Sequence, residues 1–254
     1  MRIQKWLSQL GLASRREAEQ WLLAGRISIN GKKVNELGFQ VDPESDRLTI
    51  DGRIIETAQP PLVYWMLHKP DQFLSSHKSA DEKPTIYDLP RLKGLSFKIN
   101  SVGRLDFRTE GLLLLSNDGD FIHKMTHPRY KLPRSYYALV SEHLSEEQLK
   151  KMRQGVELKD GMTEKVDVQL AQRTNLGKSK GSWYYLTVHE GRNRLVRRLF
   201  EHFDKKVVKL VRVGFGSLRL PDNLKPGEYR QLSSKEIHDL KSFARDAQNG
   251  KDSQ

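Results

Sequence analysis

Residues 102–115 read Val-Gly-Arg-Leu-Asp-Phe-Arg-Thr-Glu-Gly-Leu-Leu-Leu-Leu, a polar loop that runs into four leucines. The leucine run is typical of a short buried strand, which would hold the end of the loop in place. A loop anchored in this way is a suitable platform for a catalytic group. Asp106 lies between Arg104 and Arg108, whose charges favour an ionised carboxylate at neutral pH. The pattern alone also allows a turn residue in a surface ion pair, so both interpretations stay open here.

Helix and strand patterns alternate irregularly on both sides of this loop. Runs of apolar, β-branched and aromatic residues predict strands at 62–67, 112–115, 135–140, 166–170, 183–188 and 207–213. Apolar residues with helical spacing predict helices at 145–152, 195–203 and 233–243, two of which begin with capping-box patterns. The sequence therefore predicts an α+β domain with a mixed, mostly antiparallel sheet flanked by helices.

A smaller α/β module precedes this domain. Residues 3–10 have the apolar spacing of a helix, and residues 14–17 form a capping-box pattern for a second one. Asn30-Gly31 is a strong hairpin signal, and residues 41–50 suggest further short strands. Pro60 and Pro61 favour an extended linker. We expect a small N-terminal module at 1–56, a linker at 57–61, a larger domain at 62–245 and a polar tail at 246–254.

The charge balance points to a polyanionic partner. The 254-residue chain contains 44 Lys and Arg against 32 Asp and Glu, which gives a net charge of +12. The positive residues are concentrated in 1–33 and 191–219, where helix and turn patterns predict folded structure. Such clusters are typical of surfaces that bind phosphate backbones. The alternative is that the basic composition only maintains solubility.

Several classes of protein are excluded. No run approaches the roughly 18–20 apolar residues that a membrane span needs, so we predict no membrane partner. Cysteine is absent, which excludes disulfides, thiolate metal sites and thiol-dependent methyltransferases, and we expect a cytoplasmic protein. His123 and His127 are four residues apart without an evident third ligand. We interpret both as structural or RNA-facing, and predict neither a metal nor a cofactor.

Two stretches of the first module resemble a known domain. Residues 13–18, Ala-Ser-Arg-Arg-Glu-Ala, and 24–32, Ala-Gly-Arg-Ile-Ser-Ile-Asn-Gly-Lys, resemble the RNA-binding domain named after ribosomal protein S-four. The resemblance covers most of residues 1–52 and implies docking on structured RNA by shape and phosphate contacts. An ordinary capped helix with a solvated basic face is the alternative. The candidate RNA-binding residues in this S-four-like module are Arg15, Arg16, Arg26 and Lys32.

The larger domain carries three motifs of one family. Residues 103–119, with Gly-Arg-Leu-Asp at their start and Asn-Asp-Gly at their end, resemble the signature of the RsuA/RluB family of ribosomal RNA pseudouridine synthases. Residues 65–70 resemble the family's opening strand, and residues 190–198 its late helix. The resemblance spans residues 1 to about 235. It implies an isomerase that converts a uridine of ribosomal RNA to pseudouridine without a metal or cofactor.

The resemblance also implies roles for individual residues. Asp106 would be the catalytic carboxylate, and Tyr136 the aromatic ring that stacks on the uracil. Arg197 would pair with Asp106 and orient it. Arg104 would help to occupy the space left by the flipped base. The other basic residues of this domain that we assign to RNA binding are Lys69, Arg192, Arg194 and Arg198.

Two functional alternatives stay open. The same scaffold could serve a non-catalytic RNA-binding factor in ribosome assembly, or the same enzyme could act on small-subunit RNA. The N-terminal run and residues 190–194 look closer to the large-subunit branch of the family. We therefore favour large-subunit ribosomal RNA, or an assembly intermediate that contains it, as the partner. No association surface is readable in the sequence, so we expect a monomer.

Overall fold

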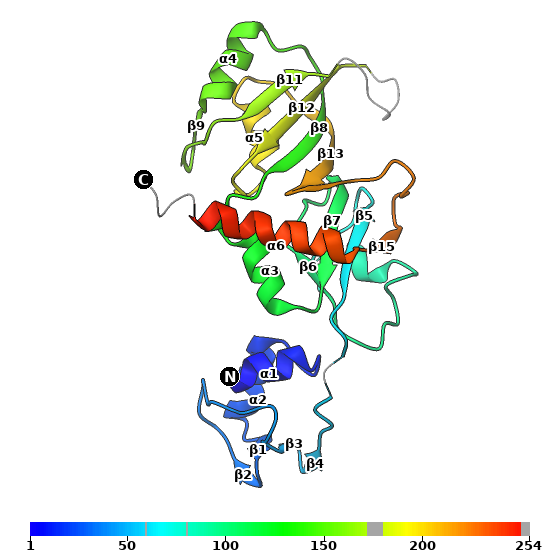
Figure 1. Cartoon of the computed structure of the whole chain (residues 1–254). Coiled ribbons are helices and arrows are strands. Elements are labelled where there is room, and N and C mark those ends of the chain that lie inside the picture. Colours follow the sequence, from blue (N-terminus) through cyan, green and yellow to red (C-terminus); the bar gives the residue numbers. More distant parts are fainter. Residues whose placement is uncertain (59, 80, 172–179, 250–254) are drawn as a thin grey trace. The chain divides into compact units, whose positions relative to one another are not determined.

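The structure, a computed structural model, describes residues 1–58, 60–79, 81–171 and 180–249 (Figure 1). The chain forms two compact units. The first comprises Met1–Leu62, Leu95–Ile99 and Asn117–Gly119, and the second comprises the rest of the chain. Each unit is described by itself below. In the part of the chain covered by these ranges, no helix is long and apolar enough to cross a membrane.

The first unit packs two helices on a small sheet. The Ser14 hydroxyl accepts a hydrogen bond from the Glu17 amide at 3.2 Å, and the Glu17 carboxylate accepts one from the Ser14 amide, so the predicted capping box is confirmed. Asn30 and Gly31 both have positive φ and form the predicted hairpin turn. Ile3, Trp6 and Leu7 belong to the buried core. The elements are α1 (Ile3–Gln9), α2 (Arg15–Leu23), β1 (Ile27–Ile29), β2 (Lys32–Lys33), β3 (Leu48–Ile50) and β4 (Arg53–Ile54).

The second unit is built on a sheet whose main strand order is β11-β12-β8-β13-β7-β5-β15, with β14 paired to β13 and β6 to β7. The neighbouring strands pair antiparallel except β13 and β7, which are parallel, so the predicted mixed, mostly antiparallel sheet is confirmed. The strands are β5 (Tyr64–Lys69), β6 (Asn100–Val102), β7 (Glu110–Ser116), β8 (Arg134–Val140), β11 (Asp167–Leu170), β12 (Ser182–Val188), β13 (Val207–Phe215), β14 (Leu218–Arg219) and β15 (Tyr229–Gln231).

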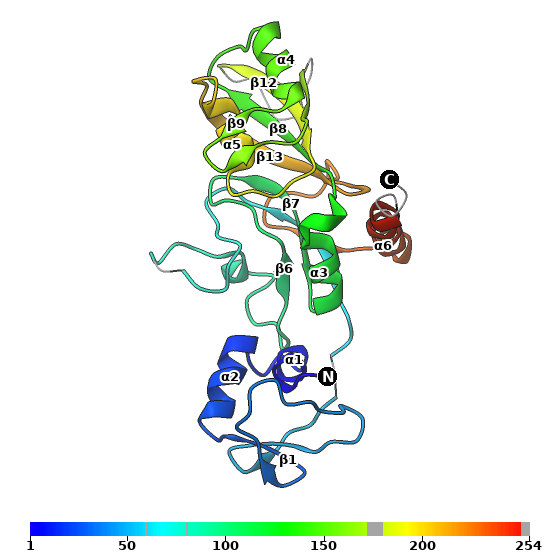
Figure 2. The same ribbon diagram turned by 90° about the vertical axis from the view of Figure 1, so that its left-hand side faces the viewer.

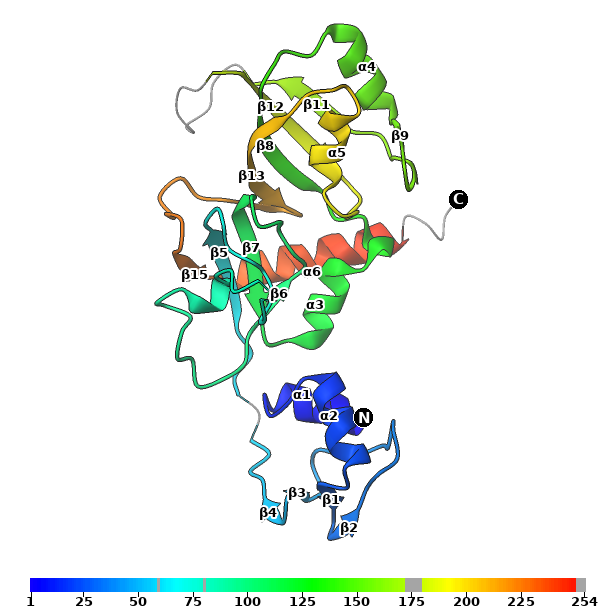
Figure 3. The same ribbon diagram turned by 180° about the vertical axis from the view of Figure 1, so that it is seen from behind.

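Helices flank this sheet at two places, as Figures 2 and 3 show from the side and from behind. Phe121 and Leu240, from α3 and α6, pack against Met66 and Leu114 of β5 and β7 in one apolar core. Phe200 of α5 contacts Tyr184 of β12, with ring centroids 5.6 Å apart. The helices are α3 (Gly119–Thr126), α4 (Glu146–Gln154), α5 (Leu195–Glu201) and α6 (Ser234–Asn249), with 3-10 turns η1 (Ile86–Asp88) and η2 (Pro128–Tyr130) and a hairpin of β9 (Glu157–Leu158) and β10 (Gly161–Met162).

Some predicted boundaries differ from the observed ones. The late helix ends at Glu201 rather than at residue 203, and β5 continues to Lys69. The last helix continues to Asn249 and so includes the first residues of the predicted polar tail, 246–254; residues 250–254 lie outside the described residues. Weakly apolar segments such as β6, β9, β10 and β15 carried no strand signal of their own, because pairing partners and not local pattern decide their conformation.

Candidate active site

The loop between β6 and β7 carries Asp106 and is fixed by hydrogen bonds on both sides of it. The Ser75 hydroxyl accepts from the Leu105 amide at 3.1 Å and donates to the Leu105 carbonyl at 3.0 Å. The Thr109 amide donates to the Asp106 carbonyl at 3.0 Å, which closes a tight turn. The buried strand that follows holds the end of the loop, as the leucine pattern predicted.

Lys69 is wholly buried beneath this loop. Its ammonium group donates to the main-chain carbonyls of Thr109 at 2.7 Å and Pro70 at 2.9 Å. Burial lowers the pKa of Lys69 to about 8, and the nearby carboxylates of Asp71, Glu110 and Asp106 only partly offset that effect. The prediction that Lys69 contacts RNA is therefore wrong, because a side chain with no exposed surface cannot reach a phosphate. It holds the loop.

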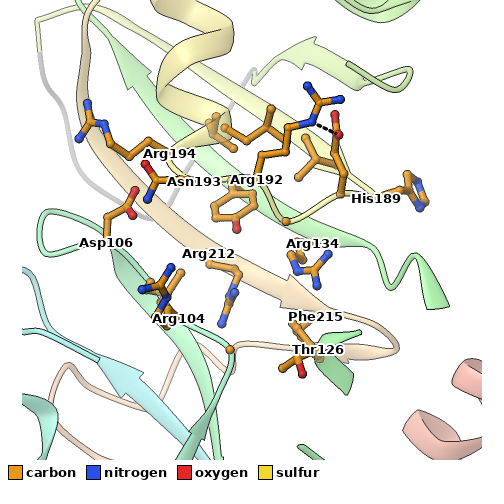
Figure 4. A pocket seen from close by; sticks show the side chains of 18 of the residues that line it. Arg104, Asp106, Thr126, Arg134, His189, Arg192, Asn193, Arg194, Arg212 and Phe215 are labelled. Atoms are coloured by element: carbon orange, nitrogen blue, oxygen red, sulfur yellow. Dashed lines mark ion pairs between the residues drawn. The ribbon is translucent and has the colours of Figure 1, made fainter. Parts of the chain in front are cut away.

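Asp106 lines a cavity of about 590 Å³ within the second unit. The walls come from the β6–β7 loop, the end of α3, β8, the β12–α5 connection and β13. Figure 4 shows Asp106 and Arg212 entering the same space from the loop and from β13, with Arg104 and Arg194 nearby. A carboxylate, an aromatic ring and several guanidinium groups thus share one hollow.

Of the two adjacent tyrosines in β8, it is Tyr136 that lines the cavity, with 8% of its surface exposed. Tyr137 lies on the opposite face of the strand, as the alternation of a strand requires. Its ring packs against Trp183 and Tyr185, with centroids 6.5 Å and 5.2 Å away. The strand alternation therefore places Tyr136, and not Tyr137, at the cavity wall.

The ion pair expected between Arg197 and Asp106 is absent among the residues described. The buried Arg197 guanidinium instead donates to the carbonyls of Val207, at 3.0 Å, and Arg108. Burial lowers the pKa of Arg197, the Arg194 charge adds to this effect, and the Asp106 charge opposes it. Arg197 therefore holds the main chain two residues after Asp106, and it acts on the carboxylate through the field and the loop, without direct contact.

The other predicted RNA-binding residues of this unit divide into two groups. Arg104 and Arg194 are exposed at the cavity wall, and Arg194 also pairs with Glu201 at 3.2 Å. Arg198 donates from Nη1 and Nη2 to the Asp160 carboxylate, at 2.7 and 3.0 Å. Arg192 donates to the Gly161 and Met162 carbonyls and pairs with Glu190. These two side chains fasten the β9–β10 hairpin beside the cavity, so their charge is largely used within the protein.

In the first unit, three of the four predicted RNA-binding side chains are exposed and make no hydrogen bond or ion pair in the part of the chain that the structure describes: Arg15, Arg16 and Lys32. Arg26 differs. Its guanidinium stacks on Trp21 at 4.7 Å from the ring centroid and donates to Asp51 at 2.9 Å. Arg15, Arg16 and Lys32 therefore remain available for a polyanion, whereas the charge of Arg26 is already paired.

The cavity residues that the sequence interpretation missed include Arg134, Arg212 and Phe215. Arg212 is 2% exposed, and burial lowers its pKa, with the neighbouring Tyr136 hydroxyl partly offsetting this. A charged residue in the middle of the apolar strand 207–215 was the available signal, since such a position is costly unless it serves a purpose.

Metal-binding clusters are lacking in the described ranges, where no three His, Asp or Glu side chains are placed to hold an ion. His123 and His127 lie with ring centroids 5.1 Å apart. The His127 ring nitrogen accepts from the Arg129 amide at 3.2 Å, so it caps the turn η2. This contact supports the structural interpretation of His127.

A basic cavity with a carboxylate and an aromatic wall, on a chain with a second basic module, is the arrangement that an enzyme acting on nucleic acid needs. Sequence comparison gives the family. The chain belongs to the RNA pseudouridylate synthase family, which matches residues 63–202, and residues 1–48 match the S4 domain. It is thus a pseudouridine synthase that acts on RNA, an isomerase with an S4 RNA-binding domain.

The similar proteins cover nearly the whole chain. An uncharacterised RNA pseudouridine synthase of Aquifex aeolicus is 39% identical over 94% of this chain and 93% of its own length. The ribosomal large subunit pseudouridine synthase B of Bacillus subtilis is 37% identical over 96% of both chains. A crystal structure of a pseudouridylate synthase superimposes with a TM-score of 0.64 and 28% identity, over 94% of this chain and 99% of that one.

Proposed function

We propose that this enzyme, acting as a monomer, isomerises a specific uridine of large-subunit ribosomal RNA, with Asp106 as its catalytic carboxylate. The observation that carries the proposal is the cavity that Asp106 shares with Tyr136 and several guanidinium groups. The full-length similarity to the Bacillus subtilis large-subunit enzyme supports the choice of RNA.

The chemistry explains why the cavity needs these groups. Isomerisation breaks the glycosidic bond, turns the base and rejoins it through carbon 5. The uracil must leave its stack to reach a carboxylate, which costs a few kcal/mol. Stacking on an aromatic ring such as Tyr136 returns about 1–3 kcal/mol. The mostly buried Tyr136 and the hydrogen-bonded Asp106 loop offer a rigid place for the flipped base.

Basic side chains on both units would bind the RNA backbone. Arg104 and Arg194 are exposed at the cavity wall, and Arg15, Arg16 and Lys32 are exposed on the S4 domain. Phosphate contacts position an RNA without specifying its sequence. We therefore assign docking to these five residues and the selection of the base to the cavity.

The proposal is tested by mapping pseudouridine in ribosomal RNA from cells with and without the gene. We expect one large-subunit position to lose its pseudouridine in the deletion strain. The wild-type gene should restore it, and Asp106→Asn, which keeps the shape and removes the charge, should not. The purified variant should still bind a large-subunit RNA fragment within about threefold of the wild-type Kd.

Three results would contradict parts of the proposal. Restoration by Asp106→Asn would remove Asp106 from its catalytic role. A lost position in small-subunit RNA would correct the substrate and leave the role of Asp106 intact. If every position kept its pseudouridine in the deletion strain, ribosomal RNA would be the wrong substrate.

A further inference from the structure

Arg212 is a buried cation at the cavity wall with hydrogen-bonding capacity to spare. Its Nε donates to the Leu112 carbonyl of the neighbouring strand at 2.7 Å, which fixes the guanidinium plane. Its Nη2 is buried and has no hydrogen-bond partner. Arg212 nevertheless lines the cavity, and Figure 4 shows its guanidinium beside the space that Asp106 enters. A buried donor without a partner is rare and calls for a ligand.

A second cation lies close to the first. The Arg134 guanidinium donates to the Leu132 carbonyl at 3.1 Å and also lines the cavity. Burial lowers the pKa of Arg134, and the Arg212 charge lowers it further, so the two groups feel each other's charge. Both lie over the ring of Phe215, with guanidinium carbons 5.6 Å and 5.3 Å from its centroid.

These two cations have no carboxylate partner in the ranges that the structure describes. The nearby acids are engaged elsewhere, since Glu164 pairs with Lys131 at 2.5 Å and Glu190 with Arg192 at 2.7 Å. An ion taken out of water is costly unless an opposite charge compensates it. The cavity therefore carries uncompensated positive charge, which favours a ligand that brings or develops negative charge.

An RNA substrate can supply that charge from a phosphate or from the base. The phosphates run along the outside of the strand, where the exposed Arg104 and Arg194 can meet them. Arg212 is only 2% exposed, and its guanidinium lies beside the Tyr136 hydroxyl and over the Phe215 ring. A flat base can enter that depth more easily than a hydrated phosphate can. The geometry favours the base.

We propose that Arg212, assisted by the charge of Arg134, donates a hydrogen bond from Nη2 to a carbonyl oxygen of the flipped uracil and stabilises the negative charge that forms on it. This inference rests on the proposed function, because it requires uracil in this cavity. It makes Arg212 a second catalytic residue, which acts on the base while Asp106 acts at the sugar.

The electron balance defines the moment at which Arg212 acts. When the bond between C1′ and N1 breaks, its electron pair stays with the base and spreads over N1 and the carbonyl oxygens. The base turns, C5 forms the new bond to C1′, and C5 then loses its proton while N1 gains one. A fixed donor at a carbonyl oxygen stabilises the charged base more than the neutral one, and that difference accelerates the reaction.

The test uses the full chain and a synthetic RNA fragment that contains the mapped target uridine. Single-turnover rates and Kd values are measured for the wild type, Arg212→Gln and Arg212→Lys. We expect Arg212→Gln to lower the maximal rate about 100-fold, as expected for the loss of one such donor, with Kd changed less than about threefold. Arg212→Lys should recover part of the rate because it keeps the charge.

Sulfur substitution identifies the contact itself. The fragment is prepared with 2-thiouridine or 4-thiouridine at the target, since sulfur accepts hydrogen bonds poorly. At one of these two positions the loss caused by Arg212→Gln should shrink from about 100-fold to below about tenfold. Each loss is the ratio of the wild-type rate to the Arg212→Gln rate on the same substrate. A change in the intrinsic reactivity of the thio base affects both rates equally and cancels in that ratio.

The outcomes separate the competing explanations. A weaker Kd with an unchanged maximal rate would mean a phosphate contact and would overturn the proposal, as would an equal loss on all three substrates. If circular dichroism shows that Arg212→Gln is unfolded, the same comparison of substrates is made with Arg212→Lys. Failure of the proposed function has a different signature, namely full turnover by Asp106→Asn, and it leaves the Arg212 cycle readable.

Discussion

Gly111, at the start of β7, lies so close to the main chain of Arg212 that a Cβ atom on it would come within 2.2 Å of the Arg212 carbonyl oxygen. Its φ of +108° also lies in a region that favours glycine. The two residues face each other in the parallel pairing of β7 and β13. This contact brings the end of the Asp106 loop next to the strand that carries Arg212, and so connects the two halves of the cavity.

Gly111→Ala should therefore disrupt both stability and activity. The positive φ costs an alanine about 1–2 kcal/mol, and overpacking against main-chain atoms adds about 1–3 kcal/mol. We expect the free energy of unfolding in urea to fall by about 2–5 kcal/mol, with pseudouridine formation reduced more than RNA binding.

Gly94→Ala separates the two costs. Gly94 has a similar φ of +88°, but a Cβ atom there would meet nothing within 4 Å. This variant should lose only the conformational part, about 1–2 kcal/mol, and keep its activity. Equal losses for the two variants would contradict the close approach of β7 and β13 as the cause.

The contact between Arg230 and Glu236 should make the folding stability depend on pH in the acidic range. Arg230 of β15 donates through two nitrogens to the Glu236 carboxylate of α6, at 2.6 and 2.9 Å. These bonds are the main cause that lowers the pKa of Glu236 from 4.5 to about 2. A lowered carboxyl pKa stabilises the fold above pH 4.5, and this contribution is lost as the pH falls toward 2.

Glu236→Gln should accordingly lower the free energy of unfolding by about 1–2 kcal/mol at pH 7, a figure reduced for partial solvent screening. The difference from wild type should vanish near pH 2, as measured by urea denaturation across the pH range. Glu142→Gln removes a more exposed carboxylate, paired with Lys205, and should cost less than about 0.5 kcal/mol. A difference that persisted below pH 2 would mean that the charge of Glu236 is not what stabilises the fold.

The buried Lys69 should make the folding stability depend on pH in the alkaline range. A lysine whose pKa is lowered to about 8 in the folded state binds fewer protons there than in the unfolded chain between pH 8 and 10.5. Stability therefore rises with pH across that window, by up to about 1.4 kcal/mol per pH unit. Lys69→Met has no such proton to lose, so the wild type should gain stability relative to it from pH 8 to 10.5.

The same variant should lower kcat about 10–100-fold, since the Asp106 loop loses its hydrogen bonds from below and a small displacement of a catalytic group is costly. KM should change less than kcat, because Lys69 has no surface from which to touch RNA. Lys225→Met, at an exposed position, should alter neither the pH profile nor kcat. A mainly raised KM would return Lys69 to the RNA-binding residues.

Local sequence patterns predicted the elements better than the site. The capping box at Ser14 and the hairpin at Asn30-Gly31 act within a few residues, so the chain shows them directly. The leucine run likewise predicted β7. The parallel pairing of β13 with β7, by contrast, joins residues about one hundred positions apart and has no local signature. That pairing is why Arg212 was not recognised, and Lys69 was misassigned because its burial depends on the pairing of β5 with β7 and on the carbonyls of a loop about forty residues away.

The salt dependence of RNA binding tests the exposed cations of the S4 domain. Each phosphate contact adds about 0.7–0.9 to the slope of log Kd against log salt, because binding releases a counterion. Arg15 and Arg16 are exposed at the start of α2, and neither side chain makes a hydrogen bond or ion pair within the described residues. The double variant Arg15→Gln, Arg16→Gln should therefore weaken binding to a large-subunit RNA fragment and reduce the slope by about 1–2, with little change in the single-turnover rate at saturating enzyme.

The control is the double variant Lys150→Gln, Lys151→Gln, which removes the same charge from exposed positions of α4 that do not line the cavity. It should leave the slope within about 0.5 of the wild type. Equal slopes for the two double variants would mean that net charge alone, and no docking surface on the S4 domain, attracts the RNA.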